Sequence, residues 1–275
     1  MQVLSIAGII VEMKYMNSKN RAILGEMVRT DFKVRYQSSI LGYLWSLLKP
    51  LSIFAIMYIV FTYIIPLGKG VEHYSVYLLM GIVMWNFFTE ATMIGASSVV
   101  ARGDLIRKIR IPRFLIVVSS SFSALINLIL SLIVVFIFAL LSGIAPSLDW
   151  LLIIPLIIEL FILALGVSFL LSALYVKFRD ITYIWEICIQ AGFYATPIVY
   201  PLMSIPTQYQ KFFFINPMTQ IIQDARYLAV TKTSATVWST VHSWRVVVPF
   251  LVVAIVVAVG GLYFKSRSKY FAEDI

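Results

Sequence analysis

The stretch Arg113-Phe-Leu-Ile-Val-Val-Ser-Ser-Ser-Phe-Ser-Ala-Leu-Ile-Asn-Leu-Ile-Leu-Ser-Leu-Ile-Val-Val-Phe-Ile-Phe-Ala-Leu-Leu-Ser142 decides the fold of this chain, because no charged residue interrupts it after Arg113. A helix crosses the hydrocarbon core of a bilayer with about 20 apolar residues, and this stretch is longer. We therefore expect an all-α integral membrane protein. The chain, 1–275, forms a single transmembrane domain with six spans, near 41–65, 74–99, 113–142, 148–175, 181–201 and 245–265.

Composition and charge support this class and set the orientation. The chain is 61% hydrophobic and 13% charged, whereas soluble domains carry about 25% charged residues. Of the Lys and Arg residues outside the spans, 16 fall at the end that holds both termini and 5 at the other. The positive-inside rule then predicts cytoplasmic termini. Membrane lipid and a cytoplasmic partner account for the net charge of +9, and no nucleic acid is expected.

An amphipathic helix is expected over 20–37, before the first span. Ile23, Leu24, Met27 and Val28 recur at helical spacing, and the opposite face carries Glu26, Arg29 and Lys33. Such a helix lies in the membrane interface. It is either a surface anchor or a collar that guides a head group or a partner.

A second short helix is expected over 103–111, between the second and third spans. Asp104 can cap it and Pro112 ends it. Its apolar face is Leu105, Ile106 and Ile109, and its basic face is Arg107, Lys108 and Arg110. The alternative is an ordinary basic loop, but a loop that only sets orientation does not need an apolar face. We interpret the segment as a coupling helix for a cytoplasmic subunit.

Two stripes inside the spans are candidate transport surfaces. One face of the fifth span carries Glu186. A carboxylate among lipid tails is costly, so this face is expected to turn away from lipid. In the first span an aromatic stripe either packs or offers ring faces along which sugars slide. The candidate lining residues are Tyr43, Phe54, Tyr58 and Phe61 in the first span and Tyr183, Glu186, Gln190, Phe193, Tyr194 and Tyr200 in or after the fifth.

The segment that follows the fifth span is expected to form a gate. Pro197 and Pro201 break the helix near the outer surface. The segment 202–226 is too polar for a complete span yet apolar enough to dip into the interface, so we expect short re-entrant helices there. Asn216 and Pro217 belong to this gate.

Motifs for enzymatic chemistry are missing from the sequence. Gly68-Lys69-Gly70 lacks the spacing and the hydroxyl of a phosphate-binding loop, so this chain does not hydrolyse ATP. His73 and His242 stand without neighbouring ligands, so no metal site is expected. No cofactor is expected on this chain.

Five stretches together resemble the permease subunits of type-2 ABC exporters, namely those that export polysaccharides such as O-antigens, capsules and teichoic acids. They occur in family order across nearly the whole chain. They are Arg35-Tyr-Gln-Ser-Ser-Ile-Leu-Gly-Tyr-Leu-Trp-Ser-Leu-Leu-Lys-Pro50, Gly103-Asp-Leu-Ile-Arg-Lys-Ile-Arg-Ile-Pro112, Phe178-Arg-Asp-Ile181, Gln190-Ala-Gly-Phe-Tyr-Ala-Thr-Pro-Ile-Val-Tyr-Pro201 and Asn216-Pro-Met218.

The resemblance implies a homodimer in the bacterial plasma (inner) membrane, with a pathway at the dimer axis lined by the first and fifth spans. It implies two ABC ATPase subunits that hold ATP and magnesium and dock on the interfacial and coupling helices. The substrate would be a lipid-diphosphate-linked glycan that enters from the cytoplasmic leaflet. The family commonly has Asn where this chain has Lys49.

Three other functions compete with polysaccharide export. A small-molecule or drug exporter of the same superfamily would need a closed cavity. A proton-coupled secondary transporter would use Glu90, Glu159 and Glu186. The expected coupling helix argues against a secondary transporter, because such a transporter needs no partner at that position. The third alternative is a lipid-modifying enzyme, but this chain lacks the catalytic residues that it would need.

Overall fold

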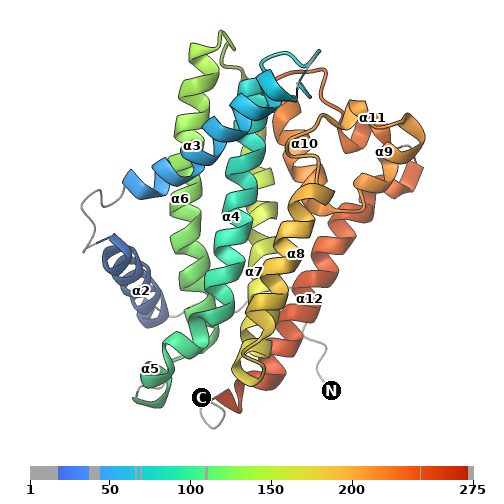
Figure 1. The fold of residues 1–275 in the computed structure, drawn as a ribbon. Coiled ribbons are helices and arrows are strands. Elements are labelled where there is room, and N and C mark those ends of the chain that lie inside the picture. The colour runs from blue at the N-terminus through green and yellow to red at the C-terminus, as the bar shows by residue number, and fades with distance from the viewer. Residues whose placement is uncertain are drawn as a thin grey trace.

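The computed structural model describes residues 18–36, 44–65, 67–68, 70–108, 111–241 and 243–271. Every regular element among these residues is a helix (Figure 1), which confirms the all-α fold. Tyr43, Ile109 and Arg110, for which the sequence suggests roles, lie outside the described residues.

Among the described residues, five segments are long and apolar enough to cross a membrane, which confirms a multi-pass membrane protein. They are α3 (Leu44–Ile59) with the π-helical turn η1 (Val60–Ile64), α4 (Tyr74–Ala101), α6 (Phe114–Leu141), η2 (Leu148–Leu152) with α7 (Ile153–Lys177), and η4 (Ser243–Val247) with α12 (Val248–Ser268).

The segment expected to cross over 181–201 is different. Its helix, α8, covers only Ile181–Ala195, and 15 residues rise about 22 Å, less than the about 30 Å of the hydrocarbon core. Thr196 is already extended, because the residue before a proline is driven out of the helical region. Pro197 therefore ends this helix well before residue 201.

The shorter helices gather at two ends of the molecule. At one end lie α2 (Ser18–Tyr36) and α5 (Gly103–Lys108), and at the other lie α10, α9 and α11 (Figure 1). The bounds of the second group are η3 (Leu202–Ser204), α9 (Thr207–Phe213), α10 (Pro217–Ala229) and α11 (Val237–Thr240).

Small residues let the central helices approach closely. α4 packs against α6 and α7, and α7 packs against α12. A Cβ on Gly95 of α4 would lie 2.5 Å from Ser168 of α7, and a Cβ on Gly260 of α12 would lie 2.1 Å from the carbonyl oxygen of Gly166. Van der Waals contact between such residues is what holds helices together in lipid.

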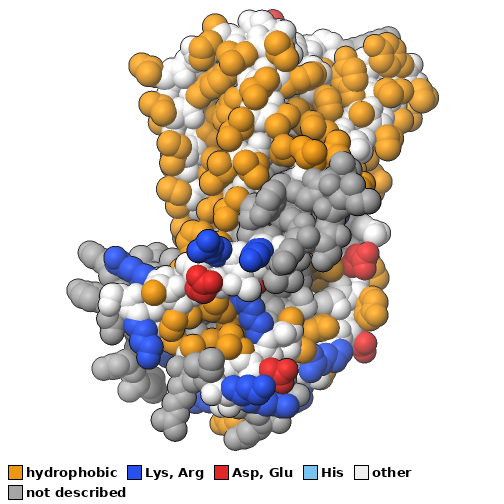
Figure 2. All heavy atoms as spheres, turned by 90° about the vertical axis from the view of Figure 1, so that its left-hand side faces the viewer, with side chains coloured by type: hydrophobic (Ala, Val, Ile, Leu, Met, Phe, Trp, Pro, Cys, Tyr) orange, Lys and Arg blue, Asp and Glu red, His pale blue; other side chains and the backbone are white. Residues whose placement is uncertain are grey.

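The surface divides into an apolar and a basic part (Figure 2). Seen from the side of α2 and α3, apolar side chains cover the part that bears α3, while Lys and Arg side chains gather over the part that bears α2 and α5. This division is the one expected where a hydrocarbon layer ends and a lipid head-group region begins.

Candidate functional site

The end that bears α2 and α5 combines an apolar underside with a charged outer face. Leu24 of α2 and Ile106 of α5 pack against one shared core cluster, which includes Val117 and Phe264. The polar faces point away from it. The exposed residues there are Glu26, Arg29, Lys33, Asp104, Arg107 and Lys108, and Leu105 is half-buried.

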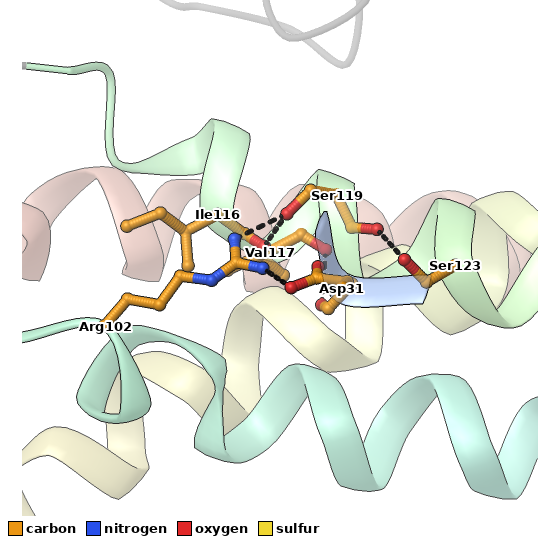
Figure 3. A network of polar contacts seen from close by, with 7 residues as sticks. Asp31, Arg102, Ile116, Val117, Ser119 and Ser123 are labelled. Carbon is orange, nitrogen blue, oxygen red and sulfur yellow. Dashed lines mark hydrogen bonds and ion pairs between the residues drawn. The ribbon is translucent and has the colours of Figure 1, made fainter. Parts of the chain in front are cut away.

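An ion pair joins α2 to the start of α5 (Figure 3). The Arg102 guanidinium donates to the Asp31 carboxylate of α2 and, at 2.8 Å, to the Ser119 hydroxyl of α6. The side chains are 20% and 24% exposed, so the pair is only partly screened by water. The residue that links α4 to α5 is thereby joined to α2 and α6 at one point.

The polar stripe of α8 lies on the surface of the chain. Tyr183, Glu186, Gln190 and Tyr194 are all exposed, and Tyr183 and Tyr194 reach 69% and 71%. The other face packs on α4: the Trp185 indole donates to Thr92 at 3.0 Å, and Phe193 meets Trp85 edge-on. An exposed face with a carboxylate and two tyrosines is unsuited to lipid tails and suited to water, sugar or another protein surface.

The aromatic stripe of α3 faces inward instead. Phe54 is 9% exposed and lies against Tyr58 and Phe138, while Phe61 is half-buried. Within one chain this stripe is therefore part of the packing between α3 and α6. The exposed side of α3 carries Leu48, Ile56 and Ile59 instead.

Of the four residues expected in the gate, Asn216 joins the start of α10 to the turn that follows α8. The Asn216 side chain caps α10, since it accepts from the Met218 amide at 3.0 Å, and Pro217 occupies the first turn. The same Asn216 side chain donates to the Thr196 hydroxyl at 2.9 Å. Pro197 and Pro201 are buried, and the Tyr200 hydroxyl donates to the carbonyl of Tyr194.

Arg226 of α10 fixes this junction from within. Its side chain is fully buried and donates to the carbonyls of Tyr77, Pro197 and Ile198 at 2.9, 2.6 and 2.5 Å. The guanidinium also lies 3.5 Å from the centre of the Tyr77 ring. Gly81 makes room for it, because a Cβ there would lie 2.4 Å from Arg226 Nη2.

The carbonyls of Pro197 and Ile198 belong to the backbone freed where α8 ends. Such groups are costly to bury without partners. Arg226 thus satisfies the backbone that Pro197 interrupts, and it joins the junction to α4. We call Arg226, its three carbonyl partners and the Tyr77 ring the arginine clamp.

α10 itself carries further buried polar groups. Asp224 accepts from the Gln220 side chain at 2.9 Å, and burial raises the pKa of its carboxyl to about 6. The Gln223 amide nitrogen and the Thr219 hydroxyl are buried without a hydrogen-bond partner in the described structure. No group of three potential metal ligands occurs among the described residues.

The three membrane acids considered for proton coupling face different surroundings. Glu90 on α4 accepts from Asn127 of α6 at 2.7 Å, Glu159 on α7 is partly buried, and Glu186 is exposed on α8.

Sequence reasoning missed Asp31 and Arg226. Asp31 sits on the polar face of an amphipathic helix, where any acid looks solvated. Arg226 follows Asn216-Pro217 on a helix whose other turns carry Ile222 and Ala229. The position of Arg226 on the apolar side of this helix was the sequence signal for a buried arginine.

The chain is similar to known membrane proteins over most of its length. The model of the ABC-2 type transporter family matches residues 24–230. An O-antigen export system permease protein, RfbA, of Klebsiella pneumoniae is 31% identical over 96% of this chain and 98% of its own length. A protein of the same name from Myxococcus xanthus is 26% identical over 93% and 96%, respectively.

A third relative, the polysialic acid transport protein KpsM of Escherichia coli, is 23% identical over 71% of this chain and 76% of its own length. The family model covers most of α2, all of α5 and α8, and the arginine clamp. Permeases of this kind work with separate ATPase subunits. The chain belongs to the ABC-2 type transporter family.

Proposed function

We propose that this chain is the permease subunit of an ATP-driven exporter that moves a lipid-linked polysaccharide outward across the bacterial plasma membrane. The observation that carries the proposal is the similarity, over nearly the full length of both chains, to permeases named for O-antigen export. ATP and magnesium belong to two partner ATPase subunits, because this chain has no phosphate-binding loop.

The coupling surface in this proposal is the exposed cationic face of α2 and α5. Arg29 and Lys33 on α2 and Arg107 and Lys108 on α5 all face solvent. The ion pair of Asp31 with Arg102 supports their joint movement. A partner that pushes on α5 would therefore also shift α2.

Six crossings are proposed, with α8 and the turn after it as the fifth. α8 starts just after α7 ends at the α5 end, and α10 lies at the opposite end (Figure 1), so the chain traverses the molecule between them. An even number of crossings puts both termini on one side, which we assign to the cytoplasm from the basic residues there. In this topology η3, α9 and α10 form the outer gate.

The transport face is the exposed stripe of α8, covered by a second copy of the chain. Tyr183, Glu186, Gln190 and Tyr194 would meet the glycan between the two copies. Tyrosine faces bind sugar rings without holding one position tightly, as a sliding polymer requires.

Reconstituted vesicles test the function. The full chain and its cognate ATPase are placed in liposomes with a lipid-linked glycan, and glycan accessible at the outward side is measured with ATP, without ATP, and with a proton gradient alone. Export that requires both the ATPase and ATP supports the proposal. Export that follows the proton gradient without the ATPase would refute it.

Charge reversal tests the coupling surface. Arg107→Glu with Lys108→Glu changes only exposed side chains, so folding is preserved while ATPase binding and export are lost. The matched control is Lys177→Glu with Arg179→Glu, which reverses two exposed charges beside α8 at the same end. Equal losses in both pairs would show that general charge, and not the α5 face, recruits the partner.

Cross-linking tests the homodimer. Cys188, the one cysteine of the chain, is exposed on α8, so a bifunctional maleimide should link two copies. The control chain carries Cys188→Ser and Ile129→Cys, which moves the thiol to an exposed position on α6. Dimers linked through position 129 but not through 188 would place the interface elsewhere.

A further inference from the structure

A cavity of about 450 Å³ lies between α3, α4 and α6, away from the transport face proposed on α8. On α4, Trp85, Phe88 and Thr92 contact the α8 side chains, whereas Asn86, Glu90 and Met93 line the cavity. These two sets lie on different faces of the helix, because each follows its own three- and four-residue spacing. The cavity is therefore a separate site.

The described part of the lining joins one cation, one acid and several neutral polar groups. Lys49 of α3 is exposed at the cavity, and the Glu90 carboxylate is held by the Asn127 amide at 2.7 Å. Asn86 adds a second amide, and the Thr89 hydroxyl is buried there without a hydrogen-bond partner in the described structure. Buried hydroxyls normally have a hydrogen-bond partner, so this unpaired hydroxyl beside a cavity points to a site for a polar ligand group.

The rest of the wall is apolar and suits the lipid part of an amphiphile. Val83, Phe87 and Leu128 are buried in it, and Trp45, 52% exposed, stands at its edge. Tryptophan with one apolar and one wet side is typical of the head-group boundary.

The position of the cavity along α6 suits a lipid head group. Asn127 is eight residues along α6 from Ser119, which binds the Arg102 that holds α2. Eight residues of helix rise about 12 Å. If α2 lies in the interface, this places the polar lining near the boundary between head groups and acyl chains on the side of α2.

From these observations we propose that the cavity binds the head group of a zwitterionic aminophospholipid from the leaflet on the side of α2. The primary ammonium faces Glu90 and Asn86, and the phosphate faces Lys49. The balance of one cation and one acid matches a phosphoethanolamine group, which has one charge of each sign. A diphosphate carries at least two negative charges, and Glu90 would repel it.

Native mass spectrometry of the full chain tests the site with an equal mixture of phosphatidylethanolamine, phosphatidylcholine and phosphatidylglycerol. The ammonium of phosphatidylethanolamine donates hydrogen bonds, whereas the trimethylated nitrogen of phosphatidylcholine cannot. Loss of a charge-assisted hydrogen bond predicts about tenfold preference for phosphatidylethanolamine over phosphatidylcholine. Equal retention of these two lipids by the wild type would overturn the proposal without any variant.

Charge-neutralising variants localise the binding. Glu90→Gln and Lys49→Gln should each abolish the preference, and Glu186→Gln, the same change on the α8 face, should leave it intact. A loss as large in Glu186→Gln would overturn the site. So would displacement of phosphatidylethanolamine by an added polyprenyl diphosphate, since the cavity would then belong to the diphosphate lipid.

Discussion

Two arginines hold the two ends of this molecule in opposite ways. Arg226, at the end with α10, is fully buried, and its described hydrogen bonds all go to backbone carbonyls. Arg102, at the end with α5, is 20% exposed and binds the Asp31 carboxylate and a hydroxyl. The first arrangement fixes a helix end that proline has broken, whereas the second joins α2 to α6 and to the link between α4 and α5. The two arginines therefore differ in burial and in the kind of partner that each one binds.

Removal of the buried arginine should have the largest effect. Arg226→Met leaves three carbonyls buried without a donor and should destabilise the protein by more than about 3 kcal/mol. Thermal unfolding in detergent measures the loss, with Arg245→Met at an exposed position as the control. Similar melting temperatures for the two variants would show that water replaces the clamp.

The space for the clamp can be removed instead. Gly81→Ala puts a methyl group 2.4 Å from Arg226 Nη2, and overpacking of this kind costs about 1 to 3 kcal/mol. Gly25→Ala is the control, since its Cβ meets nothing within 4 Å. When combined with Arg226→Met, the Gly81→Ala change should lose most of its own effect, because the clash partner is gone. Simple additivity of the two changes would contradict the clamp.

The partly exposed pair of Asp31 and Arg102 should contribute less to stability than the arginine clamp. Asp31→Asn and Arg102→Gln should each change the free energy of unfolding by about 1 kcal/mol or less. Urea or heat titration of the purified chain measures this. A loss that approaches that of Arg226→Met would erase the distinction between the two ends.

The smallest effect on stability is expected on the face of α8. Glu186 is exposed, and substitutions at such sites usually stay within about 0.5 kcal/mol. Glu186→Gln should therefore melt like the wild type while glycan export falls. Unchanged export would remove Glu186 from the transport face.

Much of this architecture was predictable because long apolar stretches leave a chain few alternatives. The helices expected over 74–99 and 113–142 are Tyr74–Ala101 and Phe114–Leu141 in the structure. Within the expected span over 181–201 the helix ends at Ala195, although the high hydropathy continues past Pro197. Hydropathy measures how apolar the side chains are, and it does not report which backbone carbonyls lack a hydrogen-bond donor.

The contacts of single polar residues could not be predicted in the same way. The partners of Arg226 on α4 and after α8 are separated from it by 149, 29 and 28 residues in the sequence. Phe54 shows the same limit, since helical spacing places it on an aromatic stripe but does not tell whether that stripe faces Phe138 or a channel. Periodicity defines a face, and only tertiary packing assigns its neighbour.

The proposed coupling of ATP hydrolysis to export through the pair of Asp31 and Arg102 is tested most directly in reconstituted vesicles. The measured quantity is the ratio of glycan exported to ATP hydrolysed. Four chains are compared: the wild type, Asp31→Arg, Arg102→Asp, and the exchange of both. We predict that each single reversal lowers the ratio, because like charges push α2 away from α5, and that the exchange restores it. A ratio that stays at the wild-type value in the single variants, or that the exchange fails to restore, would contradict the account.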